Sequence, residues 1–396
     1  MSESQSEIVI VNGARTPIGK LSGSLSSFSA MNLGGFAIKE ALSRSKVDPK
    51  EVDYVFMGHV LQAGQGQITS RQAAVNAGIP MTVPSTTVNK VCLSGLNSIY
   101  LAWKMIQTNE AKIVVAGGME SMTNAPYLLS QARSGYRAGD GKLIDSMMYD
   151  GLFCAFDQIA MGLGTERYSR AKEISRQRQD EIALLSHERA AKAIAGGIFD
   201  EEIVSVSIKQ KKGDDLIFSK DEGVRAETTF ESLSKLKPAF ESDGTITAGN
   251  ASQISDGASA VILMSAETAK QRGIEPLATI VSYGQIAGPD PSLLTQPSRA
   301  IKNAISKSDI KLSDIGLFEI NEAFAAVAAA SMDDLEVDFD RVNVNGGAIA
   351  LGHPVGMSGS RLALTLGLEL KRRGGGFGAA ALCGGGGQGD ALIIKV

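Results

Sequence analysis

Two of the three cysteines of the chain lie where a thiol could do chemistry. Cys92 stands between an apolar stretch that ends at Val91 and a helical pattern that begins near Ser94. A cysteine at a helix N-terminus feels the positive end of the helix dipole, which lowers the pKa of the thiol and favours a nucleophilic thiolate. For this residue taken alone, a buried structural cysteine is an equally good interpretation.

The second candidate, Cys383, closes an apolar run and is followed by four glycines at 384–387. Glycine-rich turns expose backbone N–H groups, which can hold an oxyanion or a phosphate. For a glycine run on its own, a tight structural turn is favoured about twofold over a binding turn. The sequence therefore places a thiol beside backbone that a ligand can approach closely.

A histidine and an asparagine supply the remaining candidates for catalysis. His353 is flanked by Gly and Pro in a loop, where a histidine is better placed for acid–base work than on a helix surface. His187 falls on a polar stretch of helix and is expected to be solvated, and His59 is expected to be structural. Asn321 follows an apolar strand and can orient a water or donate to an oxyanion, although a helix N-cap is the likelier interpretation in isolation.

The elements that carry these residues come from an internal repeat. The segment 37–45 matches 300–308 without gaps, at a constant spacing of 263 residues, as from Ala37 to Ala300. Each copy predicts an amphipathic helix, a polar turn and an apolar strand, at 54–57 and 317–320. Alternating helices and strands favour mostly parallel sheets covered on both faces, with ligands at the carboxyl ends of the strands.

The chain of 396 residues is too long for one core, and we expect three parts. The N-terminal half comprises residues 1–123 plus 250–273, and the C-terminal half comprises residues 274–396. Between them, residues 124–249 form an inserted loop domain with a basic run at 209–212. Long insertions in compact domains are usually lids or binding loops, so this part is expected to contact a ligand.

Composition excludes several classes of function. The net charge of −4 gives no overall basic field for nucleic acid or an anionic membrane, and no apolar run is long enough to span a bilayer. Residues 1–7 have the pattern of neither a signal peptide nor a transit peptide. Three cysteines are too few for a disulfide framework, so we expect a cytoplasmic protein. Metal-ligand spacings, dinucleotide fingerprints and P-loops do not occur in the sequence, and we expect no metal and no cofactor.

Taken together, six segments closely resemble the thiolase family, in particular its acetyl-CoA acetyltransferases. They occur in the order of the family and cover almost the whole chain: 91–96, 116–122, 247–252, 321–325, 346–359 and 383–386. The resemblance implies a duplicated thiolase-type fold, a five-layered αβαβα sandwich of the α/β class with an inserted loop domain.

The resemblance also implies roles for the candidate residues. Cys92 would attack an acyl-CoA and hold the acyl group, while His353 accepts its proton. His353, with a water held by Asn321, would form one oxyanion hole, and backbone N–H groups of Cys92 and Gly385 would form another. Cys383 would take the α-proton of the second acetyl-CoA. A thiolate suits this chemistry because it is both a good acyl acceptor and a good leaving group.

Coenzyme A is expected in the insertion, again from the resemblance. Arg225 would lie near the adenine and Ser252 near the pantetheine, with further substrate contacts from Ala323, Phe324 and Met161. The reaction is 2 acetyl-CoA ⇌ acetoacetyl-CoA + CoA, with coenzyme A thioesters as substrates. A homotetramer acting in fatty acid metabolism is also implied.

The sequence departs from the family pattern near the acyl pocket. Ala160 precedes Met161 where many relatives have a His, 164–166 reads Gly-Thr-Glu rather than Thr-Ala-Glu, and 292–297 lacks a Met-Gly pair. Gly384 stands where relatives often have a bulkier residue. These differences keep a broader 3-ketoacyl-CoA thiolase of fatty-acid degradation open as an alternative. Ketoacyl synthases and a non-catalytic acyl-CoA carrier are weaker alternatives, because both thiols and His353 are present.

Overall fold

The two copies of the repeat fold into the same succession of elements. The computed structural model describes residues 7–396, so the N-terminal stretch interpreted above lies, up to residue 6, outside the described residues. A helix, a short 3₁₀ turn and a strand recur in the same order, which confirms the internal repeat. They are α1 (Ala30–Arg44), η1 (Pro49–Glu51) and β3 (Tyr54–Gly58), then α8 (Gln296–Ile305), η4 (Leu312–Asp314) and β14 (Ile315–Ile320).

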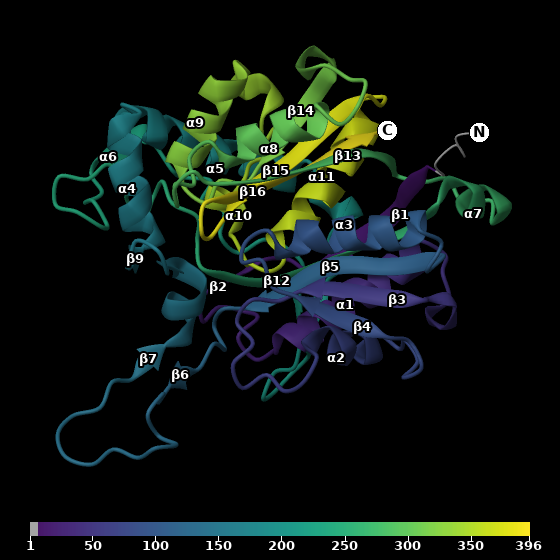
Figure 1. Ribbon diagram of the computed structural model, residues 1–396, viewed down its shortest axis with the longest axis horizontal. Coiled ribbons are helices and arrows are strands. Elements are labelled where there is room, and N and C mark those ends of the chain that lie inside the picture. Colours follow the sequence, from purple (N-terminus) through teal and green to yellow (C-terminus); the bar gives the residue numbers. More distant parts are fainter. Residues whose placement is uncertain (1–6) are drawn as a thin grey trace.

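Five layers stack through the molecule, which confirms the predicted fold class (Figure 1). Helices α1 and α2 (Thr69–Asn76) cover one outer face, and α8 and α9 (Ala325–Leu335) cover the other. The central layer holds α3 (Ser94–Gln107) and α11 (Ser358–Arg372), which contact each other and the strands on either side. These two central helices occupy equivalent places in the two copies.

The strands between these layers form one continuous ladder. Its order is β14-β15-β16-β13-β1-β12-β5-β3-β4, with β2 beside β12. The two halves join through a short antiparallel contact between β1 and β13. The remaining bounds are β1 (Ile8–Arg15), β2 (Gly19–Lys20), β4 (Ser85–Val88), β5 (Ile113–Ser121), β12 (Ser255–Ser265), β13 (Ala278–Ala287), β15 (Phe377–Gly384) and β16 (Gln388–Lys395).

The expectation of mostly parallel sheets is wrong. Among the described strands of this ladder, the parallel pairs are β3–β4, β3–β5 and β14–β15, and the others run antiparallel. The physical reason is the connections. A glycine turn at 385–387 joins β15 directly to β16 as a hairpin, and strands joined by so short a turn must be antiparallel.

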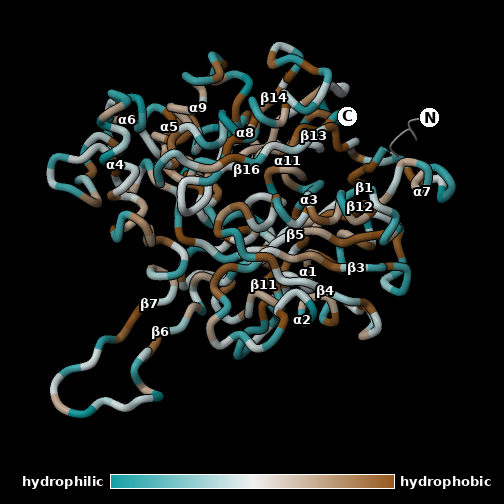
Figure 2. The backbone as a smooth tube through the Cα atoms, in the orientation of Figure 1, coloured by the Kyte–Doolittle hydropathy of each residue, from teal (hydrophilic) through white to brown (hydrophobic). Residues whose placement is uncertain are grey.

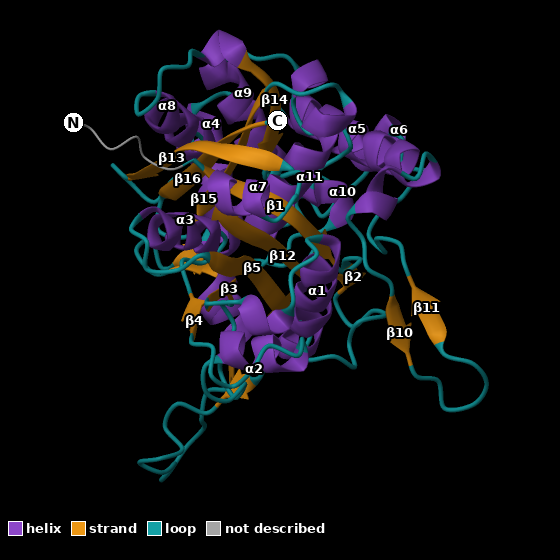
Figure 3. Ribbon diagram, turned by 90° about the vertical axis from the view of Figure 1, so that its right-hand side faces the viewer, coloured by secondary structure: helices purple, strands orange, loops and turns teal. Residues whose placement is uncertain are grey.

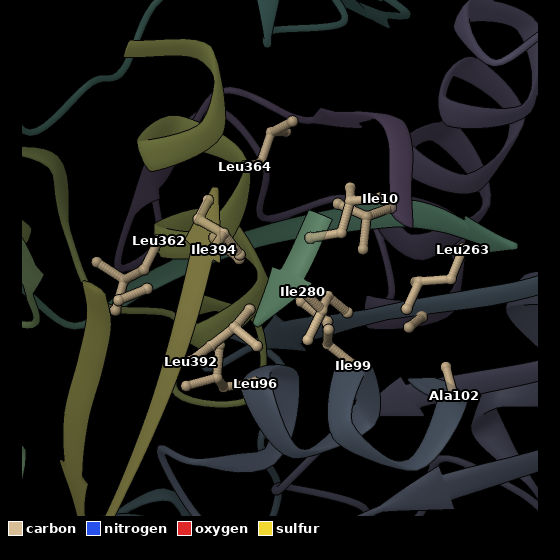
Figure 4. Close-up of a cluster of buried hydrophobic side chains, with 14 of the residues drawn as sticks. Ile10, Leu96, Ile99, Ala102, Leu263, Ile280, Leu362, Leu364, Leu392 and Ile394 are labelled. Atoms are coloured by element: carbon tan, nitrogen blue, oxygen red, sulfur yellow. The ribbon is translucent and has the colours of Figure 1, made fainter. Parts of the chain in front are cut away.

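The largest hydrophobic cluster fills the space between the two halves of this sheet, around the central helices. Ile99 of α3 and Leu362 of α11 lie in the same cluster as Ile280 of β13 and Leu392 of β16 (Figure 4). Apolar colour follows the central strands, whereas the outer turns near α7 (Ala266–Gln271) are hydrophilic (Figure 2). This burial holds the strand ends, and the loops that leave them, in fixed positions.

The insertion is anchored at its centre and extended at its ends. Helix α5 (Arg176–Ala195) packs on α9 and on α10 (Ala348–Leu351). The segment around β6 and β7 projects from the molecule as an arm (Figure 1). Strands β10 and β11 form an outlying hairpin (Figure 3). The elements of the insertion are β6 (Tyr127–Leu128), β7 (Ile144–Asp145), η2 (Met147–Leu152), β8 (Phe153–Cys154), β9 (Ile159–Ala160), α4 (Met161–Ala171), α5 (Arg176–Ala195), η3 (Ile198–Glu201), β10 (Val206–Ile208), β11 (Leu216–Phe218) and α6 (Phe230–Ser234). The short turn η5 (Phe339–Arg341) follows α9.

None of the helices within residues 7–396 combines the length and the apolarity that a membrane crossing requires.

Candidate active site

A strained turn presents Cys92. Strand β4 ends at Val88, α3 begins at Ser94, and between them Val91 has a φ of +50°. A β-branched residue in this left-handed region is a true outlier, and such strain concentrates at functional sites. The turn is tied at both ends: the Val91 N–H donates to Asn89 Oδ1 at 3.1 Å, and Ser94 Oγ donates to the Val91 carbonyl at 2.6 Å. The backbone before Cys92 is therefore rigidly held.

Cys92 itself is only 4% exposed, and burial raises the pKa of its thiol to about 12, with the charge of Glu120 acting in the same direction. The expected lowering of the pKa is wrong, because the loss of solvation on burial outweighs the backbone hydrogen bond that favours the thiolate. The thiol of Cys92 is therefore neutral at pH 7. A nearby base must therefore take its proton if Cys92 is to act as a nucleophile.

His353 has the geometry of such a base. Its Nδ1 lies 2.6 Å from Ser358 Oγ, and that hydroxyl donates its one proton to the Pro354 carbonyl at 3.0 Å. Ser358 therefore accepts from Nδ1, which leaves the proton on Nδ1 and a free lone pair on Nε2. Burial, with a smaller effect from Arg361, lowers the pKa of His353 to about 3, so the ring is neutral.

The free lone pair of His353 faces Asn321. Nε2 lies 3.4 Å from Asn321 Nδ2, so the amide donates to it, and Asn321 is fully buried. The other amide atom, Oδ1, is buried without a protein partner among the described residues. An unpaired buried acceptor beside an imidazole suits a bound water or a substrate group. Asn321 is not an N-cap, because α9 begins four residues later at Ala325.

Cys383 lies near the end of β15 and is 1% exposed. Burial raises the pKa of its thiol well above the ordinary range, and the next contribution comes from Cys92, which shows that the two thiols are close enough to interact. The turn that follows lies against the residue before Cys92: a Cβ built on Gly385 would lie 3.3 Å from the Val91 side chain. The structure thus brings Cys92, Cys383 and Gly385 together.

A cavity of about 270 Å³ opens beside His353. Three other residues expected to bind substrate, Met161, Ser252 and Phe324, also line it. Ala323 is not part of the lining but positions it, since its carbonyl accepts the Ser252 N–H at 3.0 Å. Most of the wall is apolar, with Met122, Met148, Leu152, Ala160, Gly162, Phe240, Ala251, Gln253, Ile254 and Val355. The size and the largely apolar wall are typical of a small-molecule site.

Arg225 lies outside this cavity, with an exposed side chain on the insertion. Its backbone N–H donates to Nδ1 of His187 at 3.2 Å. The expectation that His187 is solvated is wrong, because it is 1% exposed and burial lowers the pKa of its ring to about 4. The segment around Arg225 covers a helix face that the sequence pattern marks as polar. His59 is buried against Thr69, as a structural histidine would be.

The departures near the acyl pocket divide into two kinds. Ala160 lines the cavity, so its small side chain enlarges the space beside Met161. In the 164–166 segment, Gly164 and Thr165 line a separate, smaller recess beside Met161. Glu166, which the family pattern shares, accepts the backbone N–H groups of Thr245 and Ile246 at 2.7 and 2.8 Å. Glu166 therefore anchors the insertion rather than contacting a ligand.

Sequence reasoning missed Glu120, a fully buried carboxylate behind the site. It accepts the N–H groups of Val60, Leu61 and Gly356 at 3.0, 3.1 and 2.9 Å, and so ties the loop after β3 to the loop that carries His353. Burial raises the pKa of Glu120 to about 7. The available signal was a single charged residue in the apolar run of β5.

Metal-binding clusters are not found within residues 7–396: no group of three or more His, Cys, Asp or Glu side chains could hold an ion. Two buried thiols lie close to each other, and a neutral imidazole on the cavity wall accepts a hydrogen bond from a buried amide. Such a set can form a thioester and move protons next to it.

Comparison with known proteins identifies the family. Residues 8–267 match the thiolase N-terminal domain and residues 274–396 match the thiolase C-terminal domain. The chain belongs to the thiolase family. It is 54% identical to a probable acetyl-CoA acetyltransferase of Mycolicibacterium smegmatis over 98% of this chain and all of that protein. It is 50% identical to the acetyl-CoA acetyltransferase of Cupriavidus necator, over 98% of this chain and 99% of that protein.

A solved structure agrees over the full length. The crystal structure of the Bacillus anthracis acetyl-CoA acetyltransferase superposes with a TM-score of 0.96 and 43% identity, and each chain is covered completely. Relatives of this length and identity share the fold and the order of its elements. The five-layered arrangement is therefore the thiolase fold.

Proposed function

We propose that this thiolase is an acetyl-CoA C-acetyltransferase, which catalyses 2 acetyl-CoA ⇌ acetoacetyl-CoA + CoA. The observation that carries the proposal is the pair of neighbouring buried thiols, Cys92 and Cys383, together with the neutral ring of His353, whose Nε2 carries no proton. Ketoacyl synthases use a single cysteine, and a pure acyl-CoA carrier has no use for a paired nucleophile and base. The names of the relatives support the same activity.

In the first half of the reaction, Cys92 Sγ attacks the thioester carbon of acetyl-CoA. Its proton passes to Nε2 of His353, which then gives it to the departing sulfur, so that acetyl-Cys92 forms and CoA leaves as the thiol. Asn321 would hold a water with its unpaired Oδ1, and this water and the imidazole would stabilise the oxyanion. The neutral ring of His353 is the form that accepts a proton.

In the second half, the thiolate of Cys383 takes an α-proton from the second acetyl-CoA. The enolate attacks acetyl-Cys92, a carbon–carbon bond forms, and Cys92 leaves as a thiolate. The proton that Cys383 lost when it became a thiolate returns to Cys92 through His353, so protons balance. Backbone N–H groups of Cys92 and Gly385 would hold the oxyanion of the thioester on Cys92, as supported by the contact of Gly385 with the Val91 turn.

The coenzyme would enter through the insertion. The apolar cavity beside His353 suits the pantetheine arm, with Ser252, Phe324 and Met161 along it and Ala323 behind Ser252. Arg225 is exposed outside this cavity, where its guanidinium can stack on the adenine. The thioesters are the only small molecules that the scheme requires, so no metal or redox cofactor takes part in it.

Acetyl specificity is supported by the space beyond Met161. A recess there, lined also by Leu293 and Gly386, has a volume of about 10 Å³, room for about one water molecule. A long acyl chain does not fit without movement of these residues. The alternative, a 3-ketoacyl-CoA thiolase of broad chain length, requires that they move.

A homotetramer built from two dimers, acting in the cytoplasm in fatty acid metabolism, completes the proposal. Strand β4 lies at the end of the sheet order, where a second copy can pair with it. The arm carries exposed apolar side chains at Tyr127, Leu129, Tyr136 and Leu143, which suits a contact between dimers. Light scattering coupled to size exclusion tests the oligomeric state.

Intact-protein mass, with peptide mapping, tests the function. The protein is mixed with acetyl-CoA, acetoacetyl-CoA or a longer 3-ketoacyl-CoA, and Cys92→Ser serves as the control. We expect an acetyl adduct on Cys92 from the first two and no adduct on the control. A longer adduct would move the assignment to the broad-range thiolase. Binding of CoA without any adduct would favour the carrier.

A further inference from the structure

A partly buried ion pair joins the turn that carries Cys92 to the β15–β16 hairpin that carries Cys383. Lys90 precedes Cys92 by two residues, and its Nζ lies 2.8 and 3.0 Å from the two carboxylate oxygens of Asp390. Asp390 belongs to β16 and is fully buried, and the Lys90 side chain is 22% exposed. The two residues come from the two copies of the repeat and lie 300 positions apart.

The surroundings of Asp390 indicate that Lys90 is needed there. The Tyr283 hydroxyl donates to the carboxylate at 2.9 Å, and the Asn97 amide also donates to it. These neutral donors satisfy lone pairs but leave the negative charge uncompensated. Lys90 is the cation paired with Asp390 in the described part of the chain. Removing one partner of such a pair leaves the charge of the other uncompensated. Without Lys90, the Asp390 carboxylate would move toward solvent or take up a proton.

Each end of the pair is fixed to a thiol by short backbone links. On one side, the Lys90 N–H donates to Ser94 Oγ at 2.8 Å, and this hydroxyl in turn holds the Val91 carbonyl. On the other side, Asp390 faces Leu382 across the hairpin, and its neighbour Gly389 faces Cys383. The ion pair therefore joins the turn that carries Cys92 to the strand that pairs with the strand of Cys383.

We propose that Lys90 and Asp390 are positioning residues that set the separation of Cys92 from Cys383. The proposal rests on the function proposed above and adds a residue pair that touches neither substrate nor coenzyme. Carbon–carbon bond formation and cleavage need both thiols at once. Exchange of the acetyl group between Cys92 and free CoA needs only the first. Loss of the ion pair therefore impairs carbon–carbon bond formation and cleavage more than it impairs acetyl exchange with CoA.

The test compares Lys90→Met with the conservative Lys90→Arg, which keeps the cation. Lys302→Met is the matched control, since it removes a lysine paired with Asp334 at 3.0 Å on the outer surface. For Lys90→Met we expect kcat for cleavage of acetoacetyl-CoA to fall about tenfold to a hundredfold, because small misplacements of reacting groups have effects of this size. For the same variant, we expect the rate of exchange of labelled CoA to fall less than about threefold and KM to change less than about twofold. The variants Lys90→Arg and Lys302→Met should keep kcat within about twofold of the parent value.

A second measurement reports position without activity. Dibromobimane bridges two neighbouring thiols, and the yield of bridged Cys92 and Cys383 is read by peptide mapping. The yield should fall in Lys90→Met and return in Lys90→Arg. An unchanged yield overturns the proposal, as does an equal loss of cleavage and exchange. If the parent protein cleaves no acetoacetyl-CoA, the proposed function fails, and the bridging yield still decides whether the pair positions the thiols.

Discussion

Asn321 donates its side-chain amide to Nε2 of His353 at 3.4 Å; both residues are buried, and His353 lines the cavity. Ser358 holds the opposite nitrogen of the ring, so the imidazole is fixed on both sides. A neutral imidazole held in this way is kept in one orientation, and the Asn321 amide is displaced from Nε2 when the ring accepts a proton.

Asn321→Ala tests the oxyanion role of this amide. It removes the group that would hold the water, and we expect kcat for acetoacetyl-CoA cleavage to fall about a hundredfold or more, with little change in KM. Steady-state kinetics give both constants. Asn303→Ala, on the outer helix α8, is the control and should leave both unchanged. A large rise in KM with normal kcat for Asn321→Ala would show that the amide binds substrate in the ground state instead.

Cys383→Ala separates the two halves of the reaction. Cys92 and His353 are untouched, so we expect the acetyl adduct on Cys92 to form from acetyl-CoA. Condensation to acetoacetyl-CoA should fall by a factor of about 10² to 10⁴, the usual contribution of a positioned base. Intact mass detects the adduct, and a coupled assay detects the product. Normal condensation by this variant would show that another group removes the α-proton.

Gly118→Ala tests how closely β5 supports the loop that carries His353. A Cβ at this position would lie 1.9 Å from the Gly356 carbonyl, a backbone atom that cannot rotate away. We expect a loss of about 1–3 kcal/mol in the free energy of unfolding, with reduced kcat because the loop moves. Urea denaturation measures the stability. Gly316→Ala is the matched control, since its nearest neighbour would be at 3.5 Å, and it should cost little.

His187→Gln tests the burial of a histidine far from the two thiols. Burial, with the charge of Arg225, lowers the pKa of His187 to about 4 in the folded chain from its ordinary value of 6.5. Between these values the unfolded chain binds a proton that the folded chain does not, so this histidine lowers the free energy of unfolding as the pH falls from 6.5 toward 4.

The glutamine variant lacks this proton uptake. The stability of the parent relative to the variant should therefore fall by about 1.4 kcal/mol per pH unit across that window. Urea denaturation of both proteins at several pH values measures the difference. A difference that stays constant with pH would mean that His187 is solvated after all.

Much of the fold follows from local patterns in the sequence. The helix at 37–45 and its copy at 300–308 were predictable because apolar spacing and a following strand recur together. Strand direction was not predictable in the same way, because the turn at 385–387 reverses the chain where a helix would have kept β15 and β16 parallel. Helix and strand periodicity does not report how a short loop connects them.

Some features of the candidate site were likewise predictable from the sequence, and others were not. Cys92, Cys383 and His353 stand out locally because each is a rare residue type beside glycine-rich backbone or a helix start. The pKa of Cys92 was predicted in the wrong direction because burial is a property of the assembled layers. The role of Asp390 was not visible because its cationic partner, Lys90, lies in the other copy of the repeat.

The duplication has a consequence for how this site came to differ from a symmetric one. Cys92 lies on the connection into α3, and His353 lies on the equivalent connection into α11. One polypeptide unit therefore occurs twice with different reactive groups at matching places. Once the two copies were joined in a single gene product, each was free to mutate independently, and nucleophile and base became separable traits. A symmetric pair of identical units has no such freedom, because every change would appear on both sides at once.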